Sequence, residues 1–106
     1  MKMRHVSVFR LKPESRKPEV IETVAQKLRE MPDQIPAIVE CEIGVKPFPM
    51  PISSPDGHLK FYDIIQIITF ADEAGCMAYP GEKAHQDFVA FSHAYMEEVI
   101  GIDYPV

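Results

Sequence analysis

Residues 61–70, F-Y-D-I-I-Q-I-I-T-F, are the most strand-like stretch of this sequence. β-branched and aromatic residues dominate it with almost no polar interruption, which is typical of a strand that is buried on both faces. Residues 3–11 alternate in the manner of a second strand, and bulky apolar residues occupy both of its faces as well. The sequence therefore predicts a sheet whose inner strands need a cover on each side.

Helix and strand signals follow one another through the rest of the chain. Apolar residues recur with helical spacing from Pro18, which suits a first helical turn, to Met31, and Pro32 then ends the helix. Residues 38–46 alternate again, and residues 99–106 are typical of a closing strand. The apolar face predicted for the first of these two segments consists of Val39, Cys41, Ile43 and Val45.

A broken helical region follows the long strand. Asp72 is suited to cap a short helix through Ala78, and a Pro-Gly pair interrupts it before a long amphipathic helix that begins near Lys83. At about 100° per residue, the apolar residues of this helix cluster on one side. That side comprises Ala84, Phe88, Val89, Phe91, Tyr95, Met96 and Val99.

Helical phase separates two histidines in this region. His85 lies roughly 50° from the centre of the apolar side and is expected to face inward, whereas His93 falls past its edge and should be near solvent. An inward imidazole is either a core histidine that hydrogen bonds to a backbone carbonyl or a carboxylate, or part of a functional site with partners from elsewhere in the chain. The residues of the helix alone leave both interpretations open.

Residues 47–58 are the least regular part of the chain, a Pro-rich segment with four prolines and an Asp56-Gly57 turn signal. We interpret it as a long mobile loop. Its apolar residues Phe48, Met50 and Ile52 indicate either a loop that packs over a sheet edge or a partner subunit, or a lid over a pocket.

The elements occur in the order strand, helix, strand, strand, broken helix, strand. That order predicts a single α+β domain over residues 1–106, with a ferredoxin-like βαββαβ arrangement in which a four-stranded antiparallel sheet carries its helices on one face. The other face then exposes apolar residues such as Val6 and Val8, and large exposed apolar sheets are rare in monomers. We therefore expect a homodimer in which two sheets pack face to face.

Composition argues against several functional classes. The net charge of -5 and the lack of a long run of Lys and Arg disfavour a nucleic-acid partner and attachment to anionic membranes. Charged residues interrupt every apolar run near the N-terminus, so neither a secretory signal nor a spanning helix is predicted, and we expect a cytoplasmic protein. Cys41 and Cys76 form no C-x-x-C motif and are expected to stay reduced.

Several short motifs along the chain resemble those of the stress-responsive A/B barrel domains, a family of dimeric α/β-barrel proteins. They are H-V-S-V-F-R-L-K near the start, D-Q-I-P-A-I after the first helix, Tyr62-Asp63-Ile64 in the long strand, then Y-P-G-E-K-A-H-Q-D-F-V-A-F, and finally I-D-Y-P-V. The resemblance implies a barrel built from the sheets of two subunits.

One plant branch of that family resembles this chain and acts as a polyketide cyclase, which closes an aromatic ring by aldol chemistry without a cofactor. Its working residues are a histidine on the first strand, a tyrosine and a histidine six residues later, and these match His5, Tyr79 and His85. The resemblance implies that His85 is the base, Tyr79 polarises the carbonyl, and His5 orients the substrate or relays protons. The family often has H-P-x-H where residues 82–85 here are E-K-A-H.

These observations favour a pocket for a small hydrophobic, aromatic or carbonyl compound, with cyclase-like or lyase-like acid–base chemistry. The alternatives are a dimer that binds such a ligand without turnover, and a stress-associated or structural dimer in which Phe88 and Phe91 fill the same volume. The sequence has no dinucleotide, P-loop or nucleophile-elbow motif, and its histidines match no metal-binding spacing. We therefore expect neither a nucleotide nor a metal.

Overall fold

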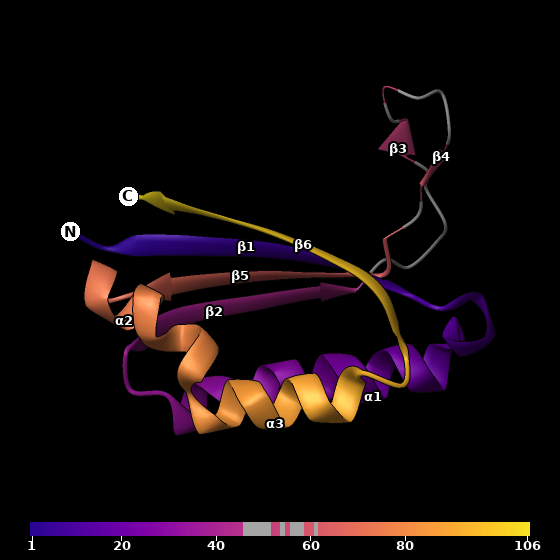
Figure 1. The fold of residues 1–106 in the computed structure, drawn as a ribbon, viewed down its shortest axis with the longest axis horizontal. Helices are drawn as coiled ribbons and strands as arrows, with labels where there is room; N and C mark the ends of the chain where they lie inside the picture. Colours follow the sequence, from indigo (N-terminus) through magenta and orange to yellow (C-terminus); the bar gives the residue numbers. More distant parts are fainter. Residues whose placement is uncertain (46–51, 54, 56–58, 61) are drawn as a thin grey trace.

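The computed structural model of the chain contains a four-stranded antiparallel sheet with its long helices on one face, which confirms the predicted fold class (Figure 1). It describes residues 1–45, 52, 53, 55, 59, 60 and 62–106. The order across the sheet is β2 (Ile38–Val45), β5 (Ile64–Phe70), β1 (Met3–Leu11) and β6 (Met96–Pro105). The first and last strands are therefore neighbours, and the two termini lie at the same end of the sheet.

Two long helices, α1 (Pro18–Glu30) and α3 (Lys83–Ser92), pack against one face of the sheet, and the short α2 (Glu73–Ala78) lies near its end (Figure 1). Asp72 caps α2 as predicted, because its carboxylate accepts a hydrogen bond of 2.8 Å from the Gly75 N–H. None of the helices in the described ranges is long and apolar enough to cross a membrane. Short 3-10 helices complete the structure: η1 (Pro13–Ser15), η2 (Met31–Gln34) and η3 (Tyr79–Gly81).

The hydrophobic core lies between the sheet and the two long helices. In β1, side chains alternate between the faces, so Phe9 and Leu11 enter the core together with Ser7 and His5 on the same face. Other core residues come from α1 and β5, which are Val24, Leu28, Ile64, Ile68 and Phe70. The helix-facing side of β1 therefore carries two polar residues into an apolar interior.

The prediction for the end of the long helix was wrong. α3 ends at Ser92, and the chain continues as β6 from Met96 instead of forming two further helical turns. Tyr95, Met96 and Val99 therefore do not lie on the apolar side of a helix. β6 satisfies the hydrogen-bonding groups along one edge of β1, and this long-range pairing outweighs the helical spacing of the local sequence.

The start of β2 also differs from the prediction. A register shift between Ile38 and Glu40 forms a β-bulge, in which Val39 is 47% exposed and Ile38 occupies the buried position opposite Phe70. Cys41, Ile43 and Val45 contact the core as predicted. A bulge inserts one residue into the alternation, so the simple alternating pattern placed Val39 on the wrong face.

Most of the Pro-rich segment 47–58, which was predicted to be a mobile loop, lies outside the described residues. Its apolar residues Phe48 and Met50 are among those not described. Within and beside this segment, β3 (Ile52–Ser53) and β4 (Leu59–Lys60) form a two-stranded antiparallel sheet. Figure 1 shows these two strands standing away from the main sheet.

The second face of the main sheet, called here the open face, carries none of the helices that the structure describes (Figure 1). Its central apolar residues form neighbouring pairs across β5, β1 and β6, and they are Val6, Val8, Ile65, Ile67, Ile100 and Ile102. Ile102 is 64% exposed and Ile100 is 48% exposed in the single chain. The open face therefore presents the continuous apolar surface that the sequence predicts.

Candidate functional site

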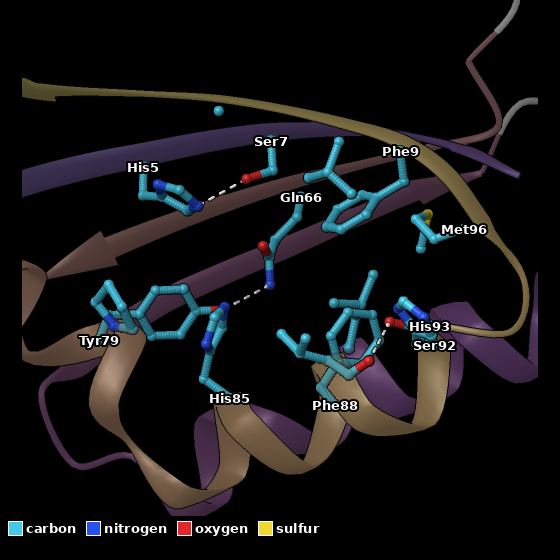
Figure 2. A pocket seen from close by; sticks show the side chains of 15 residues that line it. His5, Ser7, Phe9, Gln66, Tyr79, His85, Phe88, Ser92, His93 and Met96 are labelled. Carbon is cyan, nitrogen blue, oxygen red and sulfur yellow. Dashed lines mark hydrogen bonds between the residues drawn. The ribbon is translucent and has the colours of Figure 1, made fainter.

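A pocket of about 450 Å³ lies between the sheet and α3. Side chains from β1, β5, η3 and α3 point into it (Figure 2). Most of its lining is apolar and includes Phe9 and Phe88, whose rings meet edge-on with their centroids 6.1 Å apart. The polar residues among its walls are His5, Ser7, Gln66, Tyr79, His85, Ser92 and His93.

Tyr79 is one of the buried polar residues of the pocket. It lies in η3, only 4% exposed, and its ring packs against Phe70 with a centroid distance of 5.2 Å. Its hydroxyl donates weakly to the sulfur of Met31 at 3.7 Å and accepts from Gln66 Nε2 at 3.4 Å. Burial raises the pKa of Tyr79 to about 12, with the Gln66 hydrogen bond acting in the opposite direction. The phenol therefore remains protonated throughout the physiological pH range.

His85 lies beside Tyr79 in the first turn of α3, and the two ring centroids are 4.4 Å apart. Burial lowers the pKa of His85; the carbonyl of Pro80 partly offsets this effect, and His5 lowers the pKa further. The Nδ1 atom is buried without a well-formed hydrogen bond to any described residue. The imidazole is therefore neutral at pH 7, and one of its two nitrogens carries a lone pair that can accept a proton.

His5 reaches the pocket from the sheet. Its ring lies 5.5 Å from that of Tyr79, and both of its nitrogens have partners: Nδ1 lies 2.6 Å from Asp103 Oδ1, and Nε2 lies 2.7 Å from Ser7 Oγ. These contacts fix the orientation of the ring. His5 is therefore held in place, whereas His85 has a free nitrogen.

The structure brings the three residues suggested by the sequence, His5, Tyr79 and His85, to the wall of one pocket (Figure 2). His93 is exposed, as the helical phase predicts, and it lines the opposite end of the same pocket. The sequence did not identify Ser7, Gln66 and Ser92, which also line the pocket, or Asp103, which contacts His5. Strand alternation places Ser7 beside His5, but Gln66 and Asp103 become visible only when the register of three strands is known.

The residues that the structure describes contain no group of three or more His, Cys, Asp or Glu side chains that could hold a metal ion. The polar side chains that line the pocket carry imidazole, phenol, hydroxyl and carboxamide groups. They are suited to exchange protons and hydrogen bonds with a neutral organic molecule.

Comparison with known sequences and structures assigns the fold to a known group. The sequence profile of a family described as the Stress responsive A/B Barrel Domain matches residues 3–106. A comparison with curated proteins finds no match.

Solved structures with the same fold include three that cover almost all of the chain. A protein from Arabidopsis thaliana has 21% identity and a TM-score of 0.77, over 98% of this chain and 94% of its own. A dimeric ferredoxin-like protein of unknown function from Bacteroides fragilis has 16% identity and a TM-score of 0.73, over 99% and 96%. A hydroxynitrile lyase from Passiflora edulis has 15% identity and a TM-score of 0.74, over 99% and 93%. At these identities, the likeness shows a common fold.

Proposed function

Because this chain belongs to the stress-responsive A/B barrel domain family, we propose that its pocket binds a small carbonyl or aromatic compound and that His85 and Tyr79 perform cofactor-free acid–base chemistry on it. The reaction is of the cyclase or lyase type, in which a proton is removed from the substrate and negative charge develops on a carbonyl oxygen. The hydroxynitrile lyase from Passiflora edulis is an enzyme on the same fold, although its identity of 15% carries no residue role over to this chain.

One observation carries this proposal: a base that stays neutral lies next to an acid that stays protonated. The rings of His85 and Tyr79 are 4.4 Å apart on the wall of one largely apolar pocket. Burial shifts their pKa values in opposite directions, because it disfavours both the imidazolium and the phenolate. Pairs of groups with such divergent shifts are typical of sites that perform general acid–base catalysis.

The chemistry follows from these two protonation states. An imidazole nitrogen of His85 accepts a proton from the carbon next to a substrate carbonyl, and the electron pair of the C–H bond passes into the enolate. Tyr79 donates its hydroxyl hydrogen to the enolate oxygen, exchanging its weak contact with the Met31 sulfur for a stronger one. The enolate carbon then attacks a second carbonyl, and the imidazolium of His85 returns its proton to the alkoxide. His5, held by Asp103 and Ser7, orients the substrate.

The structural alternative requires the pocket volume to be filled by side chains. Phe88 lines the pocket without filling it, and Phe91 packs elsewhere, against Tyr95 and beneath the ammonium group of Lys27. The open volume therefore supports a ligand-binding function over a purely structural role for these residues.

A thermal-shift screen of phenolic, polyketide-like and small carbonyl compounds tests the proposal. At least one compound is expected to stabilise the wild-type protein, by about 2.7 kcal/mol when its concentration is 100 times Kd. The same compound is expected to bind at least about tenfold more weakly to His85→Ala, because that variant removes a wall of the pocket and a hydrogen-bonding partner. Measured shifts at several ligand concentrations give both affinities.

Gln86→Ala is the matched control, because Gln86 is the exposed neighbour of His85 on the same helix. This variant should bind the compound as the wild-type protein does. A screen in which no compound stabilises the wild-type protein, or equal stabilisation of the wild type and His85→Ala, would rule out the proposed site.

We also propose that a second copy of this chain covers the open face. The fold relatives from Bacteroides fragilis and Thermobifida fusca are described as dimeric. Two open faces would bury the apolar side chains that a single chain leaves in water, and burial of such area is the main source of stability in homodimers.

Sedimentation equilibrium at micromolar concentration is expected to give a mass of two chains for the wild-type protein. Ile102→Asp is expected to give a mass of one chain, because it places a charge at the most exposed apolar position of the open face. Met77→Asp is a suitable comparison, since Met77 is 75% exposed on α2, away from that face, and this variant should remain dimeric. A wild-type mass of one chain would refute the dimer.

A further inference from the structure

Three polar side chains form a hydrogen-bonded chain along the sheet wall of the pocket. Asp103 Oδ1 lies 2.6 Å from His5 Nδ1, and His5 Nε2 lies 2.7 Å from Ser7 Oγ. A carboxylate, an imidazole and a hydroxyl connected in this order form the arrangement by which many enzymes activate a serine nucleophile. We propose that Ser7 is the nucleophile of an acyl-transfer activity, with His5 as its base and Asp103 as a positioning residue.

The sheet register places these three residues with little freedom. His5 and Ser7 are two residues apart on the same face of β1, and Asp103 is directly opposite His5 in β6. Gly101 is directly opposite Ser7, and a Cβ atom there would lie 3.2 Å from both Ser7 Oγ and His5 Cε1. The absence of a side chain at Gly101 therefore leaves room for the imidazole and the hydroxyl to meet.

Asp103 determines which nitrogen of His5 carries the hydrogen. When the imidazole is neutral, the carboxylate favours the tautomer with its hydrogen on Nδ1, and the lone pair on Nε2 then accepts the hydrogen of the Ser7 hydroxyl. The oxygen of Ser7 keeps its own lone pairs for a bound molecule. Ser7 is 3% exposed and lines the pocket, so a reagent reaches it from the pocket.

The acyl-transfer step balances with the groups present and water. Ser7 Oγ attacks the carbonyl carbon of a small ester or thioester, and its proton passes to His5 Nε2. The bond to the leaving alcohol or thiol breaks, and the leaving group takes the proton from His5. Water, activated by the neutral His5, then releases the acid and restores Ser7. The substrate class is an ester or thioester whose apolar acyl group fits the pocket of about 450 Å³.

Gln66 is placed to assist attack by Ser7, and the nearby thiol of Cys76 does not compete with it. The carboxamide of Gln66 is opposite Ser7 in β5, and its long bond of 3.4 Å to the Tyr79 hydroxyl leaves it free to turn and donate to the developing oxyanion. Cys76 also lies near Asp103, but burial first and then this carboxylate raise the pKa of its thiol. The thiol therefore stays protonated and does not compete as a nucleophile.

A fluorophosphonate probe tests the proposal without knowledge of the natural substrate. Ser7 Oγ should displace fluoride from phosphorus and form a stable adduct, which peptide mass spectrometry locates in the wild-type protein. Ser92 provides an internal comparison, because it lines the same pocket but its hydroxyl donates to the Val89 carbonyl and bonds to no histidine within the described part of the chain. We expect an adduct at Ser7 that increases with time, and none at Ser92.

Substitutions distinguish a Ser7 hydroxyl that is activated by its partners from one that is merely accessible to the probe. Labelling of Ser7→Ala is expected to be at least about 100-fold slower, and labelling of Asp103→Asn at least about tenfold slower, although asparagine keeps the acceptor oxygen and the size of the side chain. Ser15→Ala, at a buried serine of η1 outside the pocket, should react as the wild type does. An absence of Ser7 adduct in the wild-type protein would overturn the proposal, and this result does not depend on whether any variant folds. Equal labelling of the wild-type protein and of folded Ser7→Ala would also overturn it. His85 takes no part in this reaction, so the outcome is independent of the proposed acid–base function.

Discussion

His85→Gln is expected to lower kcat/KM by at least about 100-fold for the carbonyl compound that the binding screen identifies, because a positioned general base contributes about 10² to 10⁴ to the rate. Glutamine fills a similar volume and keeps polar atoms near Tyr79, but it cannot accept a proton at neutral pH. The loss should therefore appear mainly in kcat, with a smaller change in KM. Steady-state kinetics of the two proteins measure both constants.

The pH dependence distinguishes a lost base from a disturbed pocket. Burial lowers the pKa of His85 below its ordinary value of about 6.5. The acidic decrease in the rate of the wild-type protein, which occurs when a proton occupies the base, should therefore have its midpoint below pH 6.5. The pKa of Tyr79, at about 12, predicts no loss of the acid up to about pH 10. His85→Gln should lack the acidic decrease.

Gln86→Ala is again the control, and its rate and pH profile should match those of the wild type. Turnover by His85→Gln at close to the wild-type rate would remove His85 from the reaction. A wild-type profile whose acidic midpoint lies above pH 6.5 would contradict the effect of burial on this imidazole.

The fold was predictable from the sequence wherever local pattern and long-range pairing agree. Residues 3–11 alternate, and they form β1 over the same range, while Pro18 begins α1 as its position suggests. The closing strand predicted over residues 99–106 lies within β6 except for its last residue, but its start was not predictable in this way, because Tyr95, Met96 and Val99 fit a helical spacing as well as a strand. Only the unpaired edge of β1 decides between them, and the local sequence contains no information about that edge.

The candidate site was predictable in part for the same reason. Helical phase and the family resemblance together point to His85. The direction in which His85 faces depends only on the local helix α3. The partners of His5 depend on how β1 aligns with its neighbours, and a shift of one residue would move Asp103 to the opposite face of the sheet. The hydrogen-bonded chain from Asp103 to Ser7 therefore required the structure.

Phe70→Ala is expected to lower the free energy of unfolding by about 3–5 kcal/mol, the range found when a buried phenylalanine is removed. Phe70 is 0% exposed at the end of β5, where it lies between Met3 of β1 and Ile38 of β2 in the sheet register. No neighbouring strand can move inward to fill the space without breaking the ladder of hydrogen bonds, so the cavity should persist. Urea denaturation followed by circular dichroism, at one fixed protein concentration, measures the loss.

The same substitution connects the core to the site, because the Phe70 ring supports Tyr79 at a centroid distance of 5.2 Å. Water that enters the cavity would reduce the burial that raises the pKa of Tyr79, so this pKa should fall from about 12 in the folded variant. NMR of carbon-labelled tyrosine measures that titration separately from the other tyrosines. Met77→Ala, at a residue that is 75% exposed, should change the stability by less than about 0.5 kcal/mol. A loss of unfolding free energy below about 1 kcal/mol in Phe70→Ala would show that the sheet relaxes into the space. An unchanged pKa of Tyr79 would show that burial of its hydroxyl does not depend on Phe70.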